Sequence, residues 1–438
     1  MVSERRLERS KSASFADYEE DPQAFVSLPY SDLKWQFAPP DNDVYPYIHY
    51  FIPIEGLSGI RQLGFLSYTG ENSQSFLFKP YPHEREDHTW GVTMTADEIA
   101  QRNGISGTKL TTLRFATLLH DISTPAGGDA VKAIDKEALD EETHWRDVVG
   151  YRGKSLINKR GVDLQEIDRI LKNEGTLGQI LDAADIITYV TKDVYNILGP
   201  HQSRLNSDYD LLSIRMILAK NPLIGNIYKD VGIEKTTGDV YFNNPDNLFD
   251  FLKIRAILHK NSYMHPLNMG RDMIVGELVT PYYSRTDTNK LTPKKLRDIS
   301  DTELMNYLGD KYKATLHRNY KAPDWVPSGE GLTSLLINTY VQYEKVDSLE
   351  EAARTADLLE ESGQTIVGLK SVRPFKTDTH FKVAGENGIE PFKEAYSDRS
   401  QEIDNMARSV GGSYVFYLNT DSNREISDLL NAAREKAA

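Results

Sequence analysis

An adjacent histidine and aspartate, His120 and Asp121, stand at the end of an apolar run from Leu110 to Leu119 that has the character of a helix. His88 lies upstream and Asp185 downstream, each in a segment with helical spacing. Two imidazoles and two carboxylates on rigid helices form a ligand set for a divalent ion that activates water. The sequence therefore predicts a metal site made of His88, His120, Asp121 and Asp185.

A histidine–aspartate dipeptide is common by chance, so the prediction depends on agreement with other residues. The predicted helix ends at Ser123-Thr124-Pro125, and at a helix end two neighbouring side chains can reach one ion. The chain has no cysteine, so any metal must be held by nitrogen and oxygen. We expect a divalent ion, with Mn, Mg, Fe, Ni and Zn as candidates.

Composition limits the class of protein. The chain has 438 residues and is 39% hydrophobic, which is enough for a sizeable core. It has no apolar stretch of the roughly 18 residues that a membrane span needs, and its first residues are polar, so we expect a cytoplasmic protein without a membrane partner. The net charge of -14 argues against long nucleic acid as a partner. A small anion can still bind to a local basic cluster.

The pattern along the chain is mainly helical. Helical spacing ends at Asn103-Gly104, and further helices are expected over about 109–121, 165–173, 177–198 and 247–263. Thr292-Pro293, Ser300 to Glu303 and Ser348 to Glu351 have the spacing of helix starts. Residues 322–331 are typical of a linker, 365–372, 379–384 and 413–418 of strands, and 391–408 of a helix. We expect a flexible tail over 1–22, a helical core over 23–270, and a helical and α+β region over 271–438.

Two polar stripes support the metal prediction. Asp185, Tyr189 and Asp193 are four residues apart, and so are Arg255, His259 and Tyr263, with His265 following. Residues at this spacing advance only about 40° around a helix, so each stripe shares one face. A guanidinium, an imidazole and a phenol together suit a phosphate chain and a sugar. Taken singly, each stripe is equally consistent with an exposed helix face.

Taken together, these residues resemble the HD superfamily of metal-dependent phosphohydrolases, and within it the deoxynucleoside triphosphate (dNTP) triphosphohydrolases. The resemblance extends in order from about residue 55 to 270, and more loosely beyond 290. It implies an HD-domain helical core with a smaller α+β C-terminal lobe. The matching motifs are Gln62-Leu63-Gly64, Arg85-Glu86-Asp87-His88, His120-Asp121, the Asp185, Tyr189 and Asp193 stripe, and the stripe from Arg255 through His259 and Tyr263 to His265.

The resemblance also implies roles for substrate-binding residues. Tyr263 would pack against the sugar and crowd its 2′ position, which favours deoxyribose. Discrimination of this kind is worth about 1 to 3 kcal/mol. The phosphates would be held by Arg85, Arg255 and His259, assisted by Lys192, and the 3′-hydroxyl by Gln62 and Asp193. The remaining predicted substrate-binding residues are Leu63, Tyr189 and His265.

The chain departs from the family pattern after the His120-Asp121 pair. Thr124 and Asp129 stand where the family commonly has histidines, and a free aspartate is a poor general acid near pH 7. His144 resembles a later active-site histidine and could supply the proton, although a polar contact between helices would explain it equally well. The predicted catalytic residues are His144 and Asp129. Ile186 occupies a position where the triphosphohydrolases often have a lysine, so we expect a weaker grip on a triphosphate.

The expected reaction is hydrolysis of a dNTP to deoxynucleoside and triphosphate. One alternative is a nucleotide phosphatase or phosphodiesterase of the same superfamily, favoured by the altered loop at 123–129. The other is a nucleotide sensor that lacks a competent acid. The resemblance also implies that the chain forms a homo-oligomer. The implied ligand is a nucleotide, which is a dNTP in the triphosphohydrolases.

Overall fold

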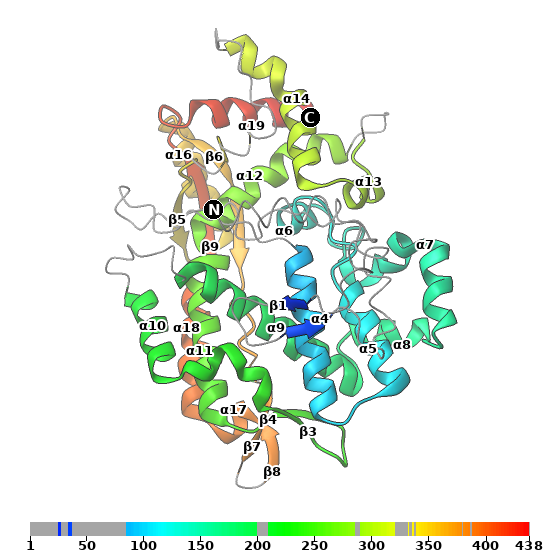
Figure 1. The fold of residues 1–438 in the computed structure, drawn as a ribbon. Helices are drawn as coiled ribbons and strands as arrows, with labels where there is room; N and C mark the ends of the chain where they lie inside the picture. The colour runs from blue at the N-terminus through cyan, green and yellow to red at the C-terminus, as the bar shows by residue number, and fades with distance from the viewer. Residues whose placement is uncertain are drawn as a thin grey trace.

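The computed structural model describes residues 25–27, 34–36, 85–198, 209–284, 290–319, 332, 335–336, 339–378, 380–385 and 388–437. The predicted tail, the predicted linker at 322–331, and Gln62 and Leu63 lie outside these residues. The described chain is mainly helical, with small sheets, so the predicted fold class is confirmed (Figure 1).

The helices of the first part pack around α4 and α9 (Figure 1). Helix α4 contacts both α5 and α9, and α8 contacts α5 and α9. The elements of this part are β1 (Phe25–Ser27), β2 (Lys34–Gln36), α4 (Arg85–Arg102), α5 (Gly107–Leu119), α6 (Gly128–Lys132), α7 (Glu141–Lys159), α8 (Leu164–Leu171), α9 (Gly175–Leu198), α10 (Tyr209–Lys220), the 3-10 helix η2 (Pro222–Asp230), β3 (Val231–Ile233), β4 (Val240–Phe242), α11 (Pro245–Leu258) and the π-helix η3 (His259–Tyr263).

Local sequence signals account for the helix ends. Gly104 adopts φ +77 directly after α4, a conformation that favours glycine, and the predicted stop is confirmed. The side chain of Asp163 accepts from Gln165 N at the start of α8, and that of Asn244 accepts from Asp246 N at the start of α11. The amide of Met264 donates to the carbonyl of His259 at 2.8 Å, which widens the end of α11 into the π-helical turn η3.

The second part combines helices with a three-stranded sheet. Its elements are α12 (Pro266–Tyr283), α13 (Pro293–Asp298), α14 (Asp301–Asn319), β5 (Gln342–Val346), α16 (Leu349–Glu361), β6 (Thr365–Val372), β7 (Lys382–Gly385), β8 (Gly388–Pro391), α17 (Phe392–Ala395), α18 (Ser397–Val410), β9 (Gly412–Leu418) and α19 (Arg424–Ala437). The strand order is β5-β9-β6, and β9 is antiparallel to both neighbours. The predicted capping box is confirmed, because Ser300 N donates to Glu303 Oε2 and Glu303 N to Ser300 Oγ.

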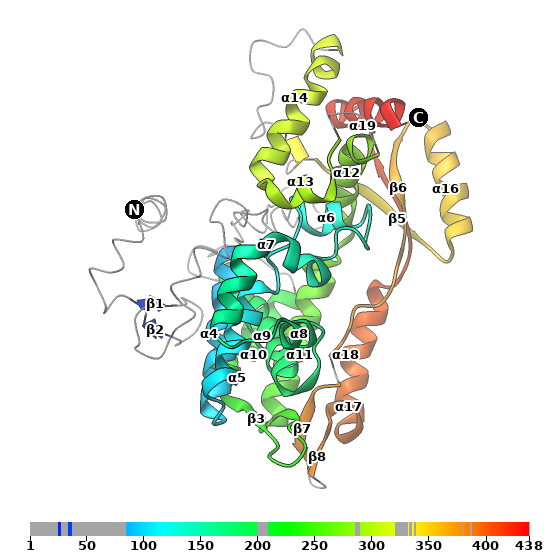
Figure 2. The ribbon, with the colours of Figure 1, turned by 90° about the vertical axis from the view of Figure 1, so that its right-hand side faces the viewer.

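Strand β7 does not join that sheet. It pairs in parallel with β4 and antiparallel with β8, so that residues 231–242 and 382–391 form one sheet in the order β3-β4-β7-β8. The helix expected over 391–408 is wrong in its extent, since β8 ends at Pro391 and Tyr396, at φ -134, separates α17 from α18. Figure 2 shows the chain running from β6 in the upper sheet down to β7 at the opposite end.

The hydrophobic core is shared across the sequence. One buried cluster joins α4, α5, α9 and α11 to side chains from 375–410, including Phe375, Phe381 and Phe392. A second cluster joins Val131 and Leu139 to α12, α14, β6, β9 and α19. Each cluster therefore contains segments from both sides of residue 270. Among the helices described, none is both long and apolar enough to cross a bilayer.

Candidate metal centre and nucleotide site

Three helices bring the predicted metal ligands together. His88 lies in the first turn of α4, His120 is the C-cap of α5 with Asp121 next to it, and Asp185 lies in α9. A buried ion pair holds α4 to α5, with Arg114 Nε 2.5 Å from Asp97 Oδ1. The hydroxyls of Thr95 and Thr188 meet at 3.2 Å between α4 and α9.

The donor atoms lie within coordination distance of a common point. The Nε2 atoms of His88 and His120 are 3.4 Å apart, and each is within 3.8 Å of Asp121 Oδ2. Asp185 Oδ1 lies 2.9 Å from His88 Nε2 and 3.9 Å from His120 Nε2. Donors about 2.1 Å from an ion are roughly 3.0 to 3.4 Å apart when they are neighbours in an octahedron or tetrahedron. His88, His120 and Asp121 thus form a group that can hold a divalent ion, and Asp185 stands at its edge.

The chemistry of the donor set fits a cation. His120 Nδ1 lies 2.7 Å from the carbonyl of Thr117, and the hydrogen bond that it donates there leaves the lone pair of Nε2 directed at the other ligands. The side chains of His88 and His120 are nearly buried, at 7% and 11% exposed, whereas Asp185 is 37% exposed. Asp185 therefore lies on the open side of the ligand group.

Next to Asp185, a cluster of rings occupies the space between α9 and η3. We call Tyr189, His259 and Tyr263, with the Asp193 carboxylate, the aromatic cluster. The rings of His259 and Tyr263 are 4.8 Å apart edge to face, and Tyr189 meets Tyr263 at 5.9 Å. The Tyr263 hydroxyl donates to Asp193 Oδ2. The two predicted stripes therefore do converge, because the π-helical turn places His259 and Tyr263 opposite α9.

Arg255 is held on three sides by protein groups. Its Nε donates to the Tyr189 hydroxyl at 2.5 Å and its Nη1 to the carbonyl of Lys376 at 2.5 Å. Its Nη2 lies 2.5 Å from Asp378 Oδ2, and both side chains of this ion pair are below 9% exposed. In this conformation the predicted phosphate-binding arginine is neutralised by a carboxylate of the C-terminal region.

Burial and charge shift the titration of these groups. Burial, and then the charge of Arg255, hold the pKa of His259 well below its ordinary value, so its ring is neutral at pH 7. Burial likewise raises the pKa of Tyr189. Asp182, one turn before Asp185, has its pKa raised to about 6 by burial, then by Asp378 and Asp185. The neutral imidazole and phenol suit hydrogen bonds to a substrate rather than charge pairing.

Other predicted residues lie at varied positions. Arg85 begins α4, one turn before His88, and its side chain is outside the described residues, as are Gln62 and Leu63. Lys192 and Asp193 are buried in α9. His265 caps α12, because its side chain accepts from Leu267 N at 3.3 Å, and this gives it a structural role beside any contact with substrate.

The two predicted catalytic residues lie in separate surroundings. His144, in the first turn of α7, has its Nδ1 3.3 Å from Asp147 Oδ2 and its Nε2 3.2 Å from the carbonyl of Glu137. Asp129 is exposed in the first turn of α6. Thr124, between the metal ligands and α6, is buried.

Sequence reasoning missed the contribution of residues 373–378, which we call the arm. Phe375 stacks on the His259 ring at 4.9 Å and 22°, and Lys376 and Asp378 contact Arg255 as described above. The arm is more than a hundred positions from Arg255, and no motif marks it. Only the three-dimensional fold reveals its place in the site.

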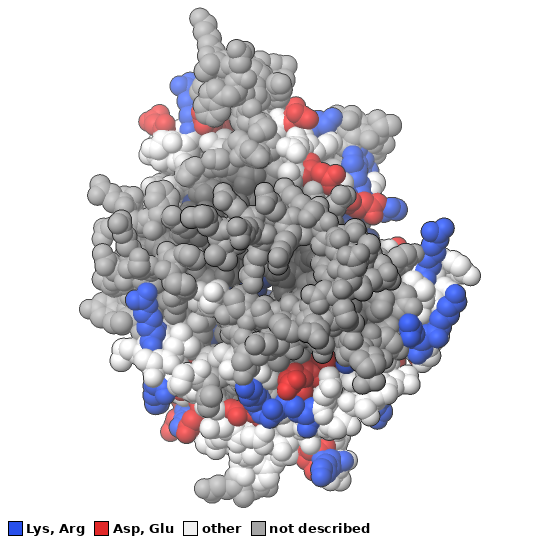
Figure 3. Space-filling model, in the orientation of Figure 1, with Lys and Arg blue, Asp and Glu red and all other residues white. Residues whose placement is uncertain are grey.

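The visible surface charge is mixed. Among the described residues in Figure 3, Lys and Arg side chains are interspersed with Asp and Glu around the edge of this face. Mixed charge of this kind does not form the basic stripe that long nucleic acid requires.

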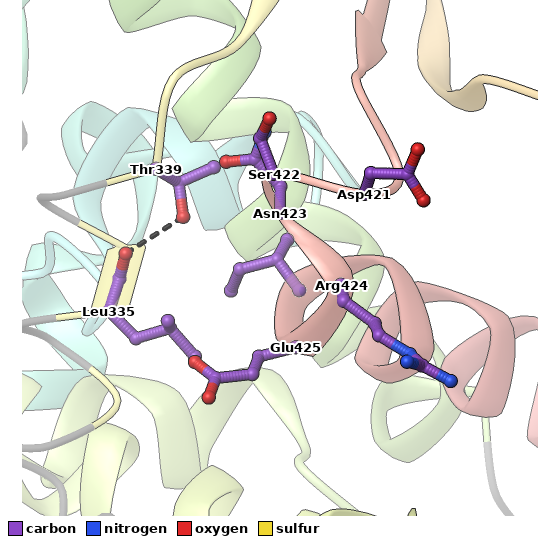
Figure 4. Close-up of a pocket in the computed structure, with 8 residues that line it drawn as sticks. Leu335, Thr339, Asp421, Ser422, Asn423, Arg424 and Glu425 are labelled. Atoms are coloured by element: carbon purple, nitrogen blue, oxygen red, sulfur yellow. Dashed lines mark hydrogen bonds between the residues drawn. The ribbon is translucent and has the colours of Figure 1, made fainter.

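A separate cavity of about 400 Å³ lies at the start of α19 (Figure 4). Its lining residues are Leu335, Thr339, Asp421, Ser422, Asn423, Arg424, Glu425 and Ile426. It contains no histidine and none of the predicted site residues, and the Arg424 side chain extends along the outside of the helix in Figure 4. The metal-ligand group, rather than this cavity, is the candidate centre for catalysis.

Comparison with known proteins identifies the fold and one domain of the chain. A structure of a hypothetical protein from Aquifex aeolicus is 13% identical, with a TM-score of 0.57, and the match covers 95% of this chain and 100% of that one. A structure of a phosphohydrolase from Bacteroides thetaiotaomicron VPI-5482 is 15% identical, with a TM-score of 0.56 and coverage of 90% and 100%. These likenesses show the fold. A search of curated proteins gives no match. Residues 85–194, which carry His88, His120, Asp121 and Asp185, match the HD domain, so the chain contains an HD domain.

Proposed function

We propose that the chain is a metal-dependent phosphohydrolase that converts a dNTP and water to deoxynucleoside and triphosphate. The observation that carries the proposal is the convergence of His88, His120, Asp121 and Asp185 beside the aromatic cluster, which shares α9 with Asp185. The phosphohydrolase from Bacteroides thetaiotaomicron supports the same reaction class through its shared fold.

Different residues bind the metal, contact the substrate and donate the proton. His88, His120, Asp121 and Asp185 would hold a divalent ion, which would supply Lewis acidity and an activated water for phosphoester hydrolysis. The ring of Tyr263 faces the sugar. Asp193 holds that ring in place by accepting a hydrogen bond from the Tyr263 hydroxyl. The buried Nδ1 of His259 has no hydrogen-bond partner among the described residues, which leaves a polar atom for the substrate. His144 is the proposed proton donor to the leaving oxygen, with Asp129 as the alternative donor.

The test is product analysis. The purified chain is incubated with each dNTP, with the matching monophosphates and with cyclic nucleotides, in Mn or Mg, and the products are separated by ion-exchange chromatography. Equal amounts of deoxynucleoside and triphosphate support the proposal. Absence of both nucleoside and released phosphate with every metal would contradict it.

A second candidate is a phosphatase or phosphodiesterase that acts on nucleotides with fewer phosphates. The observation in its favour is the ion pair with Asp378, which removes the positive charge of Arg255 from a triphosphate chain. The same experiment separates the two, because this activity releases inorganic phosphate or a monophosphate. Nucleotide binding without any turnover would instead identify the chain as a sensor.

A further inference from the structure

The arm passes α11 and η3 next to the aromatic cluster. It leaves β6 and reaches β7 (Figure 2), and on the way it is anchored by the Phe375 stack on His259 and by the two contacts with Arg255. Asp378 has φ +51, a conformation that costs energy in a residue with a Cβ atom. The ion pair and the ring stack fix the arm in spite of this cost.

The anchor leaves the site in need of another cation. Arg255 already has a protein partner at each of its three guanidinium nitrogens, and its charge is compensated by Asp378. Turning Arg255 away from Asp378 to bind phosphate would leave a buried carboxylate unpaired, which is unfavourable. A phosphate chain extending from the metal centre therefore requires a positive group whose charge is not compensated by a buried carboxylate of the protein.

Lys376 supplies such a group from the arm itself. Its side chain is exposed, while its carbonyl is tied to Arg255. The backbone of Lys376 is held at Arg255, which in turn contacts Tyr189, one turn after the metal ligand Asp185 on α9. In agreement with this placement, the charge of Lys376 lowers the pKa of Asp182 on the same helix, against the larger effect of burial.

We propose that Lys376 binds a phosphate group of the nucleotide, and that the Asp378–Arg255 ion pair is the anchor that presents it. This deepens the proposed function and rests on it. A flexible ammonium on a fixed backbone is a suitable partner for phosphate oxygens, because it can follow a chain that extends from the ion. The C-terminal region thereby becomes part of the substrate site of the HD domain.

The test measures binding rather than turnover. Lys376→Ala and Lys376→Arg are compared with the wild type by calorimetry in Mn, using a non-hydrolysable dATP analogue and deoxyadenosine as probes. Lys393→Ala is the matched control, because Lys393 is an exposed lysine of α17 outside the arm. We expect Lys376→Ala to weaken binding of the triphosphate about tenfold and to leave deoxyadenosine binding unchanged. Lys376→Arg and Lys393→Ala should bind both probes like the wild type.

The outcomes separate this inference from the function on which it rests. If the wild type binds the analogue and Lys376→Ala binds it equally well, the role of Lys376 is overturned and the proposed function stands. If Lys376→Ala weakens both probes equally, Lys376 is structural and the inference is again overturned. If the wild type binds no probe and hydrolyses no nucleotide, both proposals are overturned.

Discussion

Arg255 of helix α11 and Asp378 of the arm form an ion pair that is almost completely shielded from solvent, with 2.5 Å between Nη2 and Oδ2. Neither charge has bulk water to compensate it. The pair therefore couples the fold of the C-terminal region to the groups around the metal centre.

Asp378→Asn should destabilise the protein by about 3 kcal/mol or more, because it leaves the Arg255 charge buried and uncompensated. Asparagine tolerates positive φ, so the loss reports on the charge rather than on the backbone. The measurement is the free energy of unfolding in urea. Glu350→Gln, in the exposed pair with Arg354, is the control and should cost less than about 0.5 kcal/mol. A loss from Asp378→Asn as small as that of the control would refute the prediction.

His120→Asn and Asp185→Asn should each abolish stoichiometric metal binding and lower hydrolysis by about a hundredfold or more. Metal analysis of the purified variants checks the first effect, and product formation from a dNTP checks the second. Asp246→Asn, which alters a carboxylate that is 72% exposed, is the control and should keep both. Full metal content in His120→Asn would show that the ion binds elsewhere.

Tyr263→Phe and Tyr263→Ala should differ in sugar selectivity. Phenylalanine keeps the ring that crowds the 2′ position and loses the hydrogen bond to Asp193. Alanine loses the ring, so the preference for dATP over ATP should fall by about tenfold or more. The ratio of kcat/KM for the two nucleotides is the measurement. Equal selectivity in the two variants would mean that the ring does not face the sugar.

His144→Asn should lower kcat by about a hundredfold, without loss of metal. Asp129→Asn provides the comparison, because it removes the alternative proton donor. The variant with the larger loss of kcat identifies the donor. If both variants keep the wild-type kcat, neither residue is the general acid.

Asp182→Asn should stabilise the metal-free protein near neutral pH. The folded-state pKa of about 6 lies above the unfolded value of about 3.9, so the folded protein holds this proton more tightly. The contribution of the Asp182 carboxyl to the free energy of unfolding is fully present below the unfolded pKa. It is lost as pH rises through about 6. Asparagine avoids the loss, and the gain should be roughly 1 to 3 kcal/mol at pH 7.5 and small at pH 4.5.

Urea unfolding in EDTA at the two pH values measures this difference. EDTA is needed because a bound cation would favour the ionised carboxylate. Asp298→Asn, at an exposed surface pair with Lys294, is the control and should show no comparable pH dependence. A gain that is the same at both pH values would contradict the assignment.

Local patterns predicted much of the helical fold. The stops and caps at Gly104, Thr292 and Ser300 depend only on residues within one turn, so they can be read from the sequence. The pairing of β7 with β4 cannot be read in this way, because alternation of apolar residues does not specify a partner strand. The break at Tyr396 was missed for a similar reason, since no glycine or proline marks it.

The candidate site was likewise predictable only in part from local sequence patterns. His88, His120, Asp121 and Asp185 were predicted because ordered motifs carry them. The structure groups His88, His120 and Asp121, with Asp185 at the edge of the group. Asp378 and Lys376 were not predicted, because their role arises from contacts across a long sequence separation. The sequence also could not show that Arg255 is paired, since it carries no information on which charges meet in the interior.

The sheet formed by β3, β4, β7 and β8 bears on how the chain can be divided. Phe375, Phe381 and Phe392 come from the far side of residue 270 and are buried in the cluster that includes α4, α5, α9 and α11, where each contributes roughly 1.5 to 3 kcal/mol. A fragment cut at that residue would uncover the apolar surface beneath these rings and leave one edge of β4 without its partner. The HD domain of this chain can therefore be recognised by sequence similarity, but it does not fold independently of the C-terminal region. Deletion from the C-terminus should unfold its metal centre.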